Sequence, residues 1–237
     1  MFEKTRAIPR ALVDLDDDSG AERAARWTLT QAQSVGGQPL LYIPGKRNID
    51  YNPVLLALSK RVTTASWRSL LRERWSGGPV LAAWPDQKHV ADIDGDPRTT
   101  ALCVLGWNPK DTQGWAAAHQ PERLTPGAGN PPPAGISDPV VEQGMKTMTA
   151  LVNHANQLAG SMDRRDAVNV LLTLHDGGHR LEPEELYAWA LANGWPARGA
   201  ERLKEFAKQI NRGSRPQADR SALRPDILQV WRVEAGS

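Results

Sequence analysis

Residues 79–105 read PVLAAWPDQKHVADIDGDPRTTALCVL, and this stretch decides the fold of the N-terminal half. Its two apolar runs, 79–83 and 99–105, predict strands that are buried on both faces. The polar segment 86–92 between them predicts a short helix. A helix between two such strands is typical of a parallel sheet, because parallel neighbours need a crossover connection.

The same alternation continues toward both ends of the N-terminal half. Further strands are predicted at 11–13, 39–43 and 62–64, and further helices at 19–35, 53–60, 67–75 and 109–118. Strands that alternate with helices predict an α/β fold with a parallel sheet covered on both faces. We assign this fold to residues 1–124.

The chain changes character after residue 124. Residues 125–137 contain four prolines and three glycines, which predicts a linker. Asp138 and Pro139 then suit the N-cap and the first position of a helix. Apolar residues recur at helical spacing beyond this point, so residues 138–237 are predicted to form a mostly helical domain.

The residues that follow the predicted strands gather aromatic and basic side chains. In a parallel sheet the carboxyl ends of the strands meet at one edge, where such folds bind their ligands. This edge is predicted to carry Lys46, Arg47, Trp67, Trp84 and Trp107. Aromatic faces beside cations suit base stacking or a protein partner. The alternative is that the tryptophans cover the core beneath loops.

Two helices joined by a tight turn are predicted at residues 186–205. Ala190 is small enough for close helix packing, and Gly194 can adopt the left-handed conformation that the turn requires. Trp195 supplies an apolar residue after the turn, and Ala200 and Leu203 face inward. This pattern resembles a helix-turn-helix motif. Residues 227–233 predict a final strand, which extends the resemblance to winged-helix domains.

The resemblance implies nucleic-acid binding, most simply DNA binding, with the second helix in a groove. The basic residues that would contact phosphates, or lie near the wing, are Arg198, Arg202, Lys204, Lys208, Arg212 and Arg232. Pro196, Glu201 and Glu205 depart from what such a helix favours. The alternative is an ordinary helical hairpin that packs within a bundle or binds another protein.

The distribution of charge agrees with this interpretation. The whole chain carries a net charge of only +2, but residues 198–232 contain nine basic and four acidic side chains. Residues 139–197 contain four basic and seven acidic side chains. A local basic segment is the electrostatic signature of phosphate contacts, although a solvated helix face produces the same count.

Asp14 and Asp16 follow the first predicted strand and suggest a second function. Two carboxylates at one sheet edge suit Mg²⁺, so the alternative is a Mg²⁺-dependent enzyme acting on nucleotides or nucleic acid. The cluster has no partner motif elsewhere, and a solvated acidic loop explains it equally well. The sequence leaves open whether the protein is an enzyme, assigns no catalytic residue and predicts no cofactor other than this Mg²⁺.

Composition narrows the remaining classes. No apolar run is long enough to span a bilayer and no signal peptide is visible, which predicts a cytoplasmic protein without a membrane partner. Cys103 is the single cysteine, so an internal disulfide is excluded and a buried, inert thiol is expected. A further alternative function is a non-catalytic adaptor subunit that uses its tryptophans to anchor a protein partner.

Overall fold

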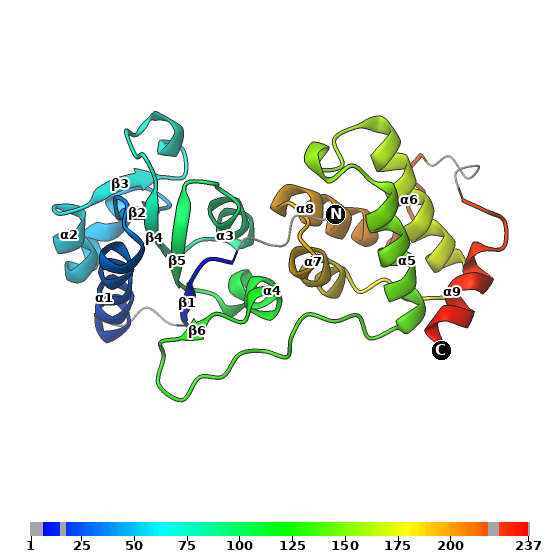
Figure 1. The fold of residues 1–237 in the computed structure, drawn as a ribbon, viewed down its shortest axis with the longest axis horizontal. Coiled ribbons are helices and arrows are strands. Elements are labelled where there is room, and N and C mark those ends of the chain that lie inside the picture. The colour runs from blue at the N-terminus through cyan, green and yellow to red at the C-terminus, as the bar shows by residue number, and fades with distance from the viewer. Residues whose placement is uncertain (1–6, 15–17, 218–222, 237) are drawn as a thin grey trace. The chain divides into compact units, whose positions relative to one another are not determined.

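The computed structural model describes residues 7–14, 18–217 and 223–236, which form two compact units (Figure 1). The first unit ends at Pro133 and the second begins at Ala134, so the division falls inside the stretch that the sequence marks as a linker. Each unit buries its own set of apolar side chains. None of the helices in these described ranges has the length and apolar character needed to cross a bilayer.

The first unit is built on a six-stranded sheet in the order β3-β2-β4-β5-β1-β6, and every neighbouring pair is parallel. The predicted α/β fold is therefore confirmed. The strands are β1 (Arg10–Val13), β2 (Leu40–Ile43), β3 (Thr63–Ser66), β4 (Gly78–Ala83), β5 (Thr99–Leu105) and β6 (Glu122–Arg123). Strand β6 was not predicted; its two polar residues pair with β1 at the edge of the sheet.

Helices cover both faces of this sheet (Figure 1). One face packs against α1 (Asp18–Val35) and α2 (Pro53–Ser59), and the other packs against α3 (Gln87–Asp94) and α4 (Pro109–His119). Successive side chains of a strand point to opposite faces, so β4 and β5 contribute to both cores. This two-sided burial explains why their sequences are continuous apolar runs.

Side-chain caps fix where the helices after the strands begin. Asn52 accepts a hydrogen bond from the amide of Leu55 and precedes Pro53, and Asn108 caps α4 ahead of its own proline. Asp86 caps α3 by accepting from the amide of His89. Each cap satisfies an amide that has no partner within the helix. These caps also fix the course of the loops that leave the carboxyl ends of the strands.

The helix predicted at residues 67–75 is wrong in extent, because only a short 3-10 turn, η2 (Leu70–Arg72), is present. Ser69 is the physical reason. Its hydroxyl accepts a hydrogen bond from the amide of Ser66 at 2.9 Å, and this local bond offers the backbone an alternative to the helical pattern.

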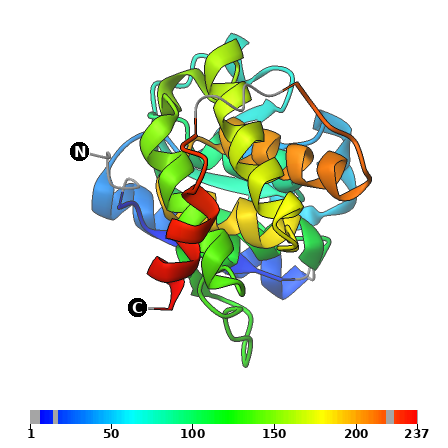
Figure 2. The ribbon, with the colours of Figure 1, turned by 90° about the vertical axis from the view of Figure 1, so that its right-hand side faces the viewer.

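The second unit contains only helices among its described residues (Figure 2). They are α5 (Pro139–Leu151), α6 (Ser161–Asp176), α7 (Pro183–Ala192), α8 (Ala197–Asn211) and α9 (Ile227–Ala235), with a 3-10 turn, η3 (His154–Asn156), after α5. Asp138 caps α5 as expected, accepting from the amides of Val140 and Val141 with Pro139 at the first helical position.

The predicted strand at 227–233 is wrong, because these residues form helix α9 and supply no wing. Ile227, Val230 and Trp231 recur at helical spacing, and Trp231 is fully buried, with its indole N–H bonded to the hydroxyl of Thr147 on α5. Figure 2 shows α9 beside α5. Leu228 packs against Gly177, where an added Cβ would lie 2.5 Å from a Leu228 methyl carbon. Packing on α5 and α6 thus decides the helical state of α9.

Candidate functional site

The carboxyl ends of β2, β4 and β5 surround a cavity of about 350 Å³. Its lining consists of Pro44, Asn48, Tyr51, Asn52, Trp84 and Trp107. We refer to this as the aromatic cavity. Two of its rings project into solvent, since Tyr51 is 94% and Trp107 is 68% exposed. Most large aromatic side chains are buried in folded proteins, so two exposed rings on one cavity mark a surface suited to binding.

The topology of the sheet explains why a cavity forms here. From β2 the chain moves to β3 through α2, whereas from β4 it moves in the opposite direction to β5 through α3. The two helices lie on opposite faces of the sheet. A crevice opens where adjacent strands send their connections in opposite directions, and in open α/β sheets this switch point is the usual place for a ligand.

Trp84 has an unusual backbone conformation at this crevice. Its φ is 55°, in the left-handed region, while its amide still donates to the carbonyl of Leu105 at 2.8 Å. A bulky residue in this region stores about 1–3 kcal/mol of strain, and such strain concentrates at functional sites. The conformation turns the chain sharply at the end of β4 and directs Trp84 to the cavity.

The structure brings together only part of the predicted edge. Trp84 and Trp107 line the aromatic cavity, and Lys46 and Arg47 begin η1 (Lys46–Tyr51), the 3-10 helix that also carries Asn48. Trp67 is not among the lining residues. Its ring stacks on His89 with centroids 3.7 Å apart and packs against the core on the α3 side of the sheet.

The acidic pair predicted to hold Mg²⁺ can be followed at one residue only, because Asp16 lies outside the described residues. The carboxylate of Asp14 forms an ion pair with Arg123 of β6, and the backbone amide of Asp14 donates to the hydroxyl of Thr125 at 3.0 Å. An arginine paired with a carboxylate competes with a cation for it. Within the described residues, no three His, Cys, Asp or Glu side chains are grouped as a metal site would require.

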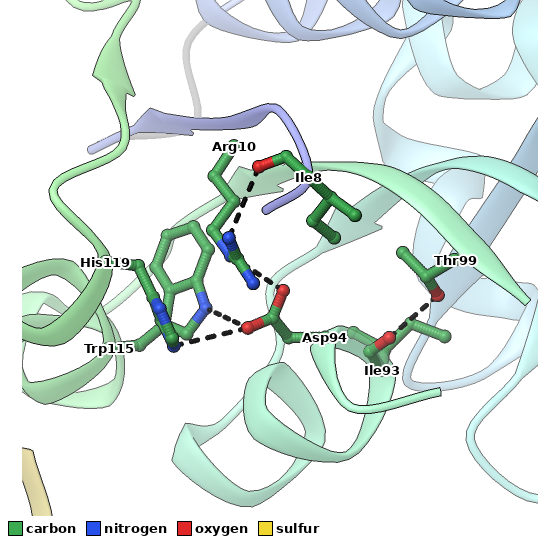
Figure 3. A network of polar contacts seen from close by, with 7 residues as sticks. All are labelled: Ile8, Arg10, Ile93, Asp94, Thr99, Trp115 and His119. Atoms are coloured by element: carbon green, nitrogen blue, oxygen red, sulfur yellow. Dashed lines mark hydrogen bonds and ion pairs between the residues drawn. The ribbon is translucent and has the colours of Figure 1, made fainter. Parts of the chain in front are cut away.

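A second polar cluster lies at the opposite, amino edge of the sheet (Figure 3). Asp94 accepts from Arg10 Nε at 2.9 Å and from the indole of Trp115 at 3.3 Å, and His119 Nε2 lies 3.3 Å from the same carboxylate. The side chains of Arg10, Asp94 and His119 are at most 9% exposed. This cluster ties α3 and α4 to β1, and its burial indicates a structural role.

In the second unit, α7 and α8 form the predicted pair of helices joined by a glycine turn. Gly194 has a φ of 79°, and the amide of Trp195 donates to the carbonyl of Ala190 at 3.0 Å. Ala190 and Ala200 are fully buried, which lets the helices approach closely. Trp195 is buried, and its indole donates to Thr149 of α5 at 3.0 Å.

Comparison with known protein families finds a similarity in this second unit. Residues 137–232 match the family described as "Domain of unknown function (DUF1889)". The DUF1889 match begins just ahead of α5 and ends inside α9, so it includes both α7 and α8. None of the curated proteins and none of the solved structures matches the chain significantly.

Within the region similar to DUF1889, the predicted basic residues fall into two groups. Arg198 and Arg202 are exposed on α8, Arg212 is exposed at the C-cap of α8, and Arg232 is exposed on α9, where it donates to the carbonyl of Gly177. Lys208 is partly exposed and pairs with Glu205 at 3.1 Å. Lys204 differs from the prediction. Its side chain is only 6% exposed, with the ammonium 3.0 Å from Glu184 and over the ring of Tyr187.

Proposed function

We propose that this protein binds nucleic acid, with duplex DNA as the expected form, through the exposed arginine side chains of α8. The observation that carries the proposal is a continuous row of exposed residues that runs along this helix to its C-cap, Arg212. Its members are spaced by four or three residues and are Arg198, Arg202, Glu205, Gln209 and Arg212. Residues with this spacing lie on one helix face.

The row has the length and charge that phosphate contacts need. From Arg198 to Arg212 it extends about 21 Å at the rise of an α-helix. Glu205, its one acidic member, is paired with Lys208, which reduces its repulsion of phosphates. Arg202 is held in place because its guanidinium donates to the carbonyl of Gln157 at 2.7 Å. Arginine keeps further N–H donors after one such bond, so Arg202 can still contact a phosphate.

The opposite face of α8 is buried, which agrees with the arginine row facing solvent. Leu203, Phe206, Ala207 and Ile210 are buried, which fixes this face against the other helices of the unit. The arginine row therefore faces solvent on a rigid element. In helix-turn-helix proteins the second helix of the pair enters the major groove, and α8 is the second helix here. Since no wing is present in the described residues, we assign the contacts to α8 alone.

The test is a fluorescence anisotropy titration of the full chain with labelled duplex DNA, single-stranded DNA and RNA at several salt concentrations. The variant replaces Arg198, Arg202 and Arg212 with alanine. The matched control replaces three exposed cations of the same unit that lie outside the row, Lys146, Arg180 and Arg224. Both variants lose three positive charges, so a difference between them reports position rather than net charge.

We expect wild type and the control to bind duplex DNA with a steep salt dependence. The row variant should bind at least tenfold more weakly, and its salt slope should fall by about one for each lost phosphate contact. If both variants lost affinity to the same extent, the effect would be due to net charge and not to the position of the arginines. No binding to any of the three nucleic acids at about 50 mM salt, where nonspecific contacts are strong, would refute the proposal.

A further inference from the structure

We infer that the aromatic cavity of the first unit is a nucleotide site, in which a planar base stacks on Trp107 and Tyr51. This inference concerns residues of the α/β unit and does not depend on the arginines of α8. Its ligand is the base of a nucleotide, supplied either as a free mononucleotide or as an unpaired position of a nucleic-acid strand.

The lining of the cavity favours a flat, aromatic ligand. Tyr51 and Trp107 offer ring faces to solvent, and Trp84 lines the same cavity from the end of the neighbouring strand. Bases stack on such rings whatever their sequence, because every base has a π face. A volume of about 350 Å³ is within the range of small-molecule sites. Several rings around one cavity suit a base better than a flexible aliphatic ligand.

Polar groups at the cavity provide a means of orienting the ring. Asn48 is exposed on η1 and lines the cavity, so its side-chain amide can both donate to and accept from the edge of a base. Asn52 has a different role. Its side-chain oxygen already caps α2 by accepting from Leu55, and it therefore holds the cavity wall in place.

Two cations beside the cavity favour a nucleotide over an uncharged ring. Lys46 and Arg47 are exposed and open the same 3-10 helix that carries Asn48 and Tyr51. Lys46 has only a loose ion pair with Glu73, at 3.7 Å, and 69% of its side chain remains exposed. Such a pair of cations attracts the phosphate of a nucleotide. A sugar can also stack on tryptophan, but a neutral sugar would make no use of these charges.

The position of the cavity gives independent support. It lies at the topological switch point of a parallel sheet, and the residue that turns β4 toward it, Trp84, has a left-handed backbone. Binding sites of open α/β sheets occur at such points, and strained residues are retained where a ligand needs them. At the other edge, by contrast, the side chains of Arg10 and Asp94 are at most 9% exposed and the ring of Trp115 beside them is fully buried.

The experiment measures binding of the full chain to adenosine and guanosine monophosphates, adenosine and ribose 5-phosphate by calorimetry and ligand-observed NMR. Trp107→Ala and Tyr51→Ala test the rings, and both residues are exposed enough for the fold to tolerate the change. Leu71→Ala is the control, because Leu71 is 91% exposed in the same unit but does not line the cavity. The double variant Lys46→Ala/Arg47→Ala tests the phosphate contact.

We expect both monophosphates to bind, adenosine to bind more weakly and ribose 5-phosphate to bind weakest. Trp107→Ala should raise the Kd of adenosine monophosphate about tenfold, in line with the effect of removing one stacking ring. The double variant Lys46→Ala/Arg47→Ala should bind the monophosphates more weakly than wild type does. Its affinity for adenosine should be unchanged. Leu71→Ala should change neither.

A second arm identifies the source of the base. It uses a short single-stranded oligoadenylate and the variant that lacks the three α8 arginines, so that binding through α8 does not contribute. Binding of this strand that Trp107→Ala removes assigns the cavity to an unpaired base, and binding of monophosphates alone assigns it to a free nucleotide. The inference is overturned if the oligoadenylate does not bind and neither monophosphate binds at roughly 5 mM, well above the Kd of a weak site. It is also overturned if binding persists unchanged in both ring variants, or if ribose 5-phosphate binds as well as the monophosphates.

Discussion

Arg10 and Asp94 form a buried ion pair between the first residue of β1 and the last residue of α3. Arg10 Nε lies 2.9 Å from Asp94 Oδ1, and the two side chains are 9% and 8% exposed. Trp115 donates to the second oxygen of the same carboxylate (Figure 3). Because both charged groups are buried and each is the other's ionic partner, loss of either one leaves an uncompensated charge in the interior.

Replacing Asp94 with alanine should therefore destabilise the protein by about 3–5 kcal/mol, the cost of breaking a buried pair. The measurement is denaturant unfolding of the full chain followed by tryptophan fluorescence. Glu73→Ala is the control, since Glu73 and Lys46 are 3.7 Å apart and their side chains are 28% and 69% exposed. Such surface pairs contribute about 0–1 kcal/mol. Similar costs for both substitutions would show that the Arg10–Asp94 pair does not stabilise the fold.

His119 should make stability depend on pH. Burial lowers the pKa of His119 from its ordinary 6.5 to about 4, although Asp94 acts in the opposite direction. Between these values the unfolded chain binds a proton that the folded protein does not, so stability decreases as pH falls from 6.5 toward 4. The loss due to this one group is roughly 2–3 kcal/mol.

The difference in unfolding free energy between wild type and His119→Gln isolates this effect from that of the carboxylates. It should change by the predicted amount across this pH window and remain constant above it. A difference that does not vary with pH would mean that His119 titrates alike in the folded and unfolded states.

The sequence allowed much of the first unit to be predicted, for a specific physical reason. The strands β4 and β5 are buried on both faces, so each is a short continuous apolar run, and its short length favours a strand over a helix. Edge strand β6 was not predicted because Glu122 and Arg123 are polar. Its pairing with β1 is continued by a hydrogen bond from the amide of Leu124 to the carbonyl of Leu12. Backbone hydrogen bonding at a sheet edge has almost no compositional signature.

Long-range contacts decided the features that the sequence did not predict. Trp67 follows β3 as expected, but its stacking on His89 from α3 removes it from the cavity lining. Lys204 belongs to a basic helix, yet Glu184 and Tyr187 of α7 surround its ammonium. The exposed Tyr51 was overlooked because it lies eight residues beyond β2. The switch point that brings it beside Trp84 depends on the order of the strands in the sheet.

Gly37 is expected to tolerate no side chain. Its φ is 92°, and an added Cβ would lie 2.6 Å from the Cα of Gly78 at the start of β4. Gly37→Ala combines an unfavourable conformation with a backbone clash and should cost more than about 2 kcal/mol. Gly36→Ala is the matched control, with a φ of 74° and nothing within 4 Å of the added atom. It should cost only about 1–2 kcal/mol, as left-handed alanine does.

Thermal unfolding of the two glycine variants measures this difference directly. Equal shifts in Tm would indicate that the chain near residue 37 can move away from β4 without cost.

Cys103 should react with thiol reagents only when the protein unfolds. It is fully buried in the middle of β5, and burial raises the pKa of its thiol, so very little of the nucleophilic thiolate forms at neutral pH. As the single cysteine of the chain, it reports on one position alone. Labelling with an aromatic disulfide should be negligible in the native protein and reach one equivalent in denaturant.

The rate of Cys103 labelling at intermediate denaturant also gives the free energy with which β5 opens. Because β5 is paired on both sides, by β4 and β1, this free energy should approach that of global unfolding. Gly37→Ala and Asp94→Ala should then accelerate labelling in proportion to their loss of stability. Fast labelling of the native wild type would show that the centre of the sheet opens locally, contrary to the packing described for it.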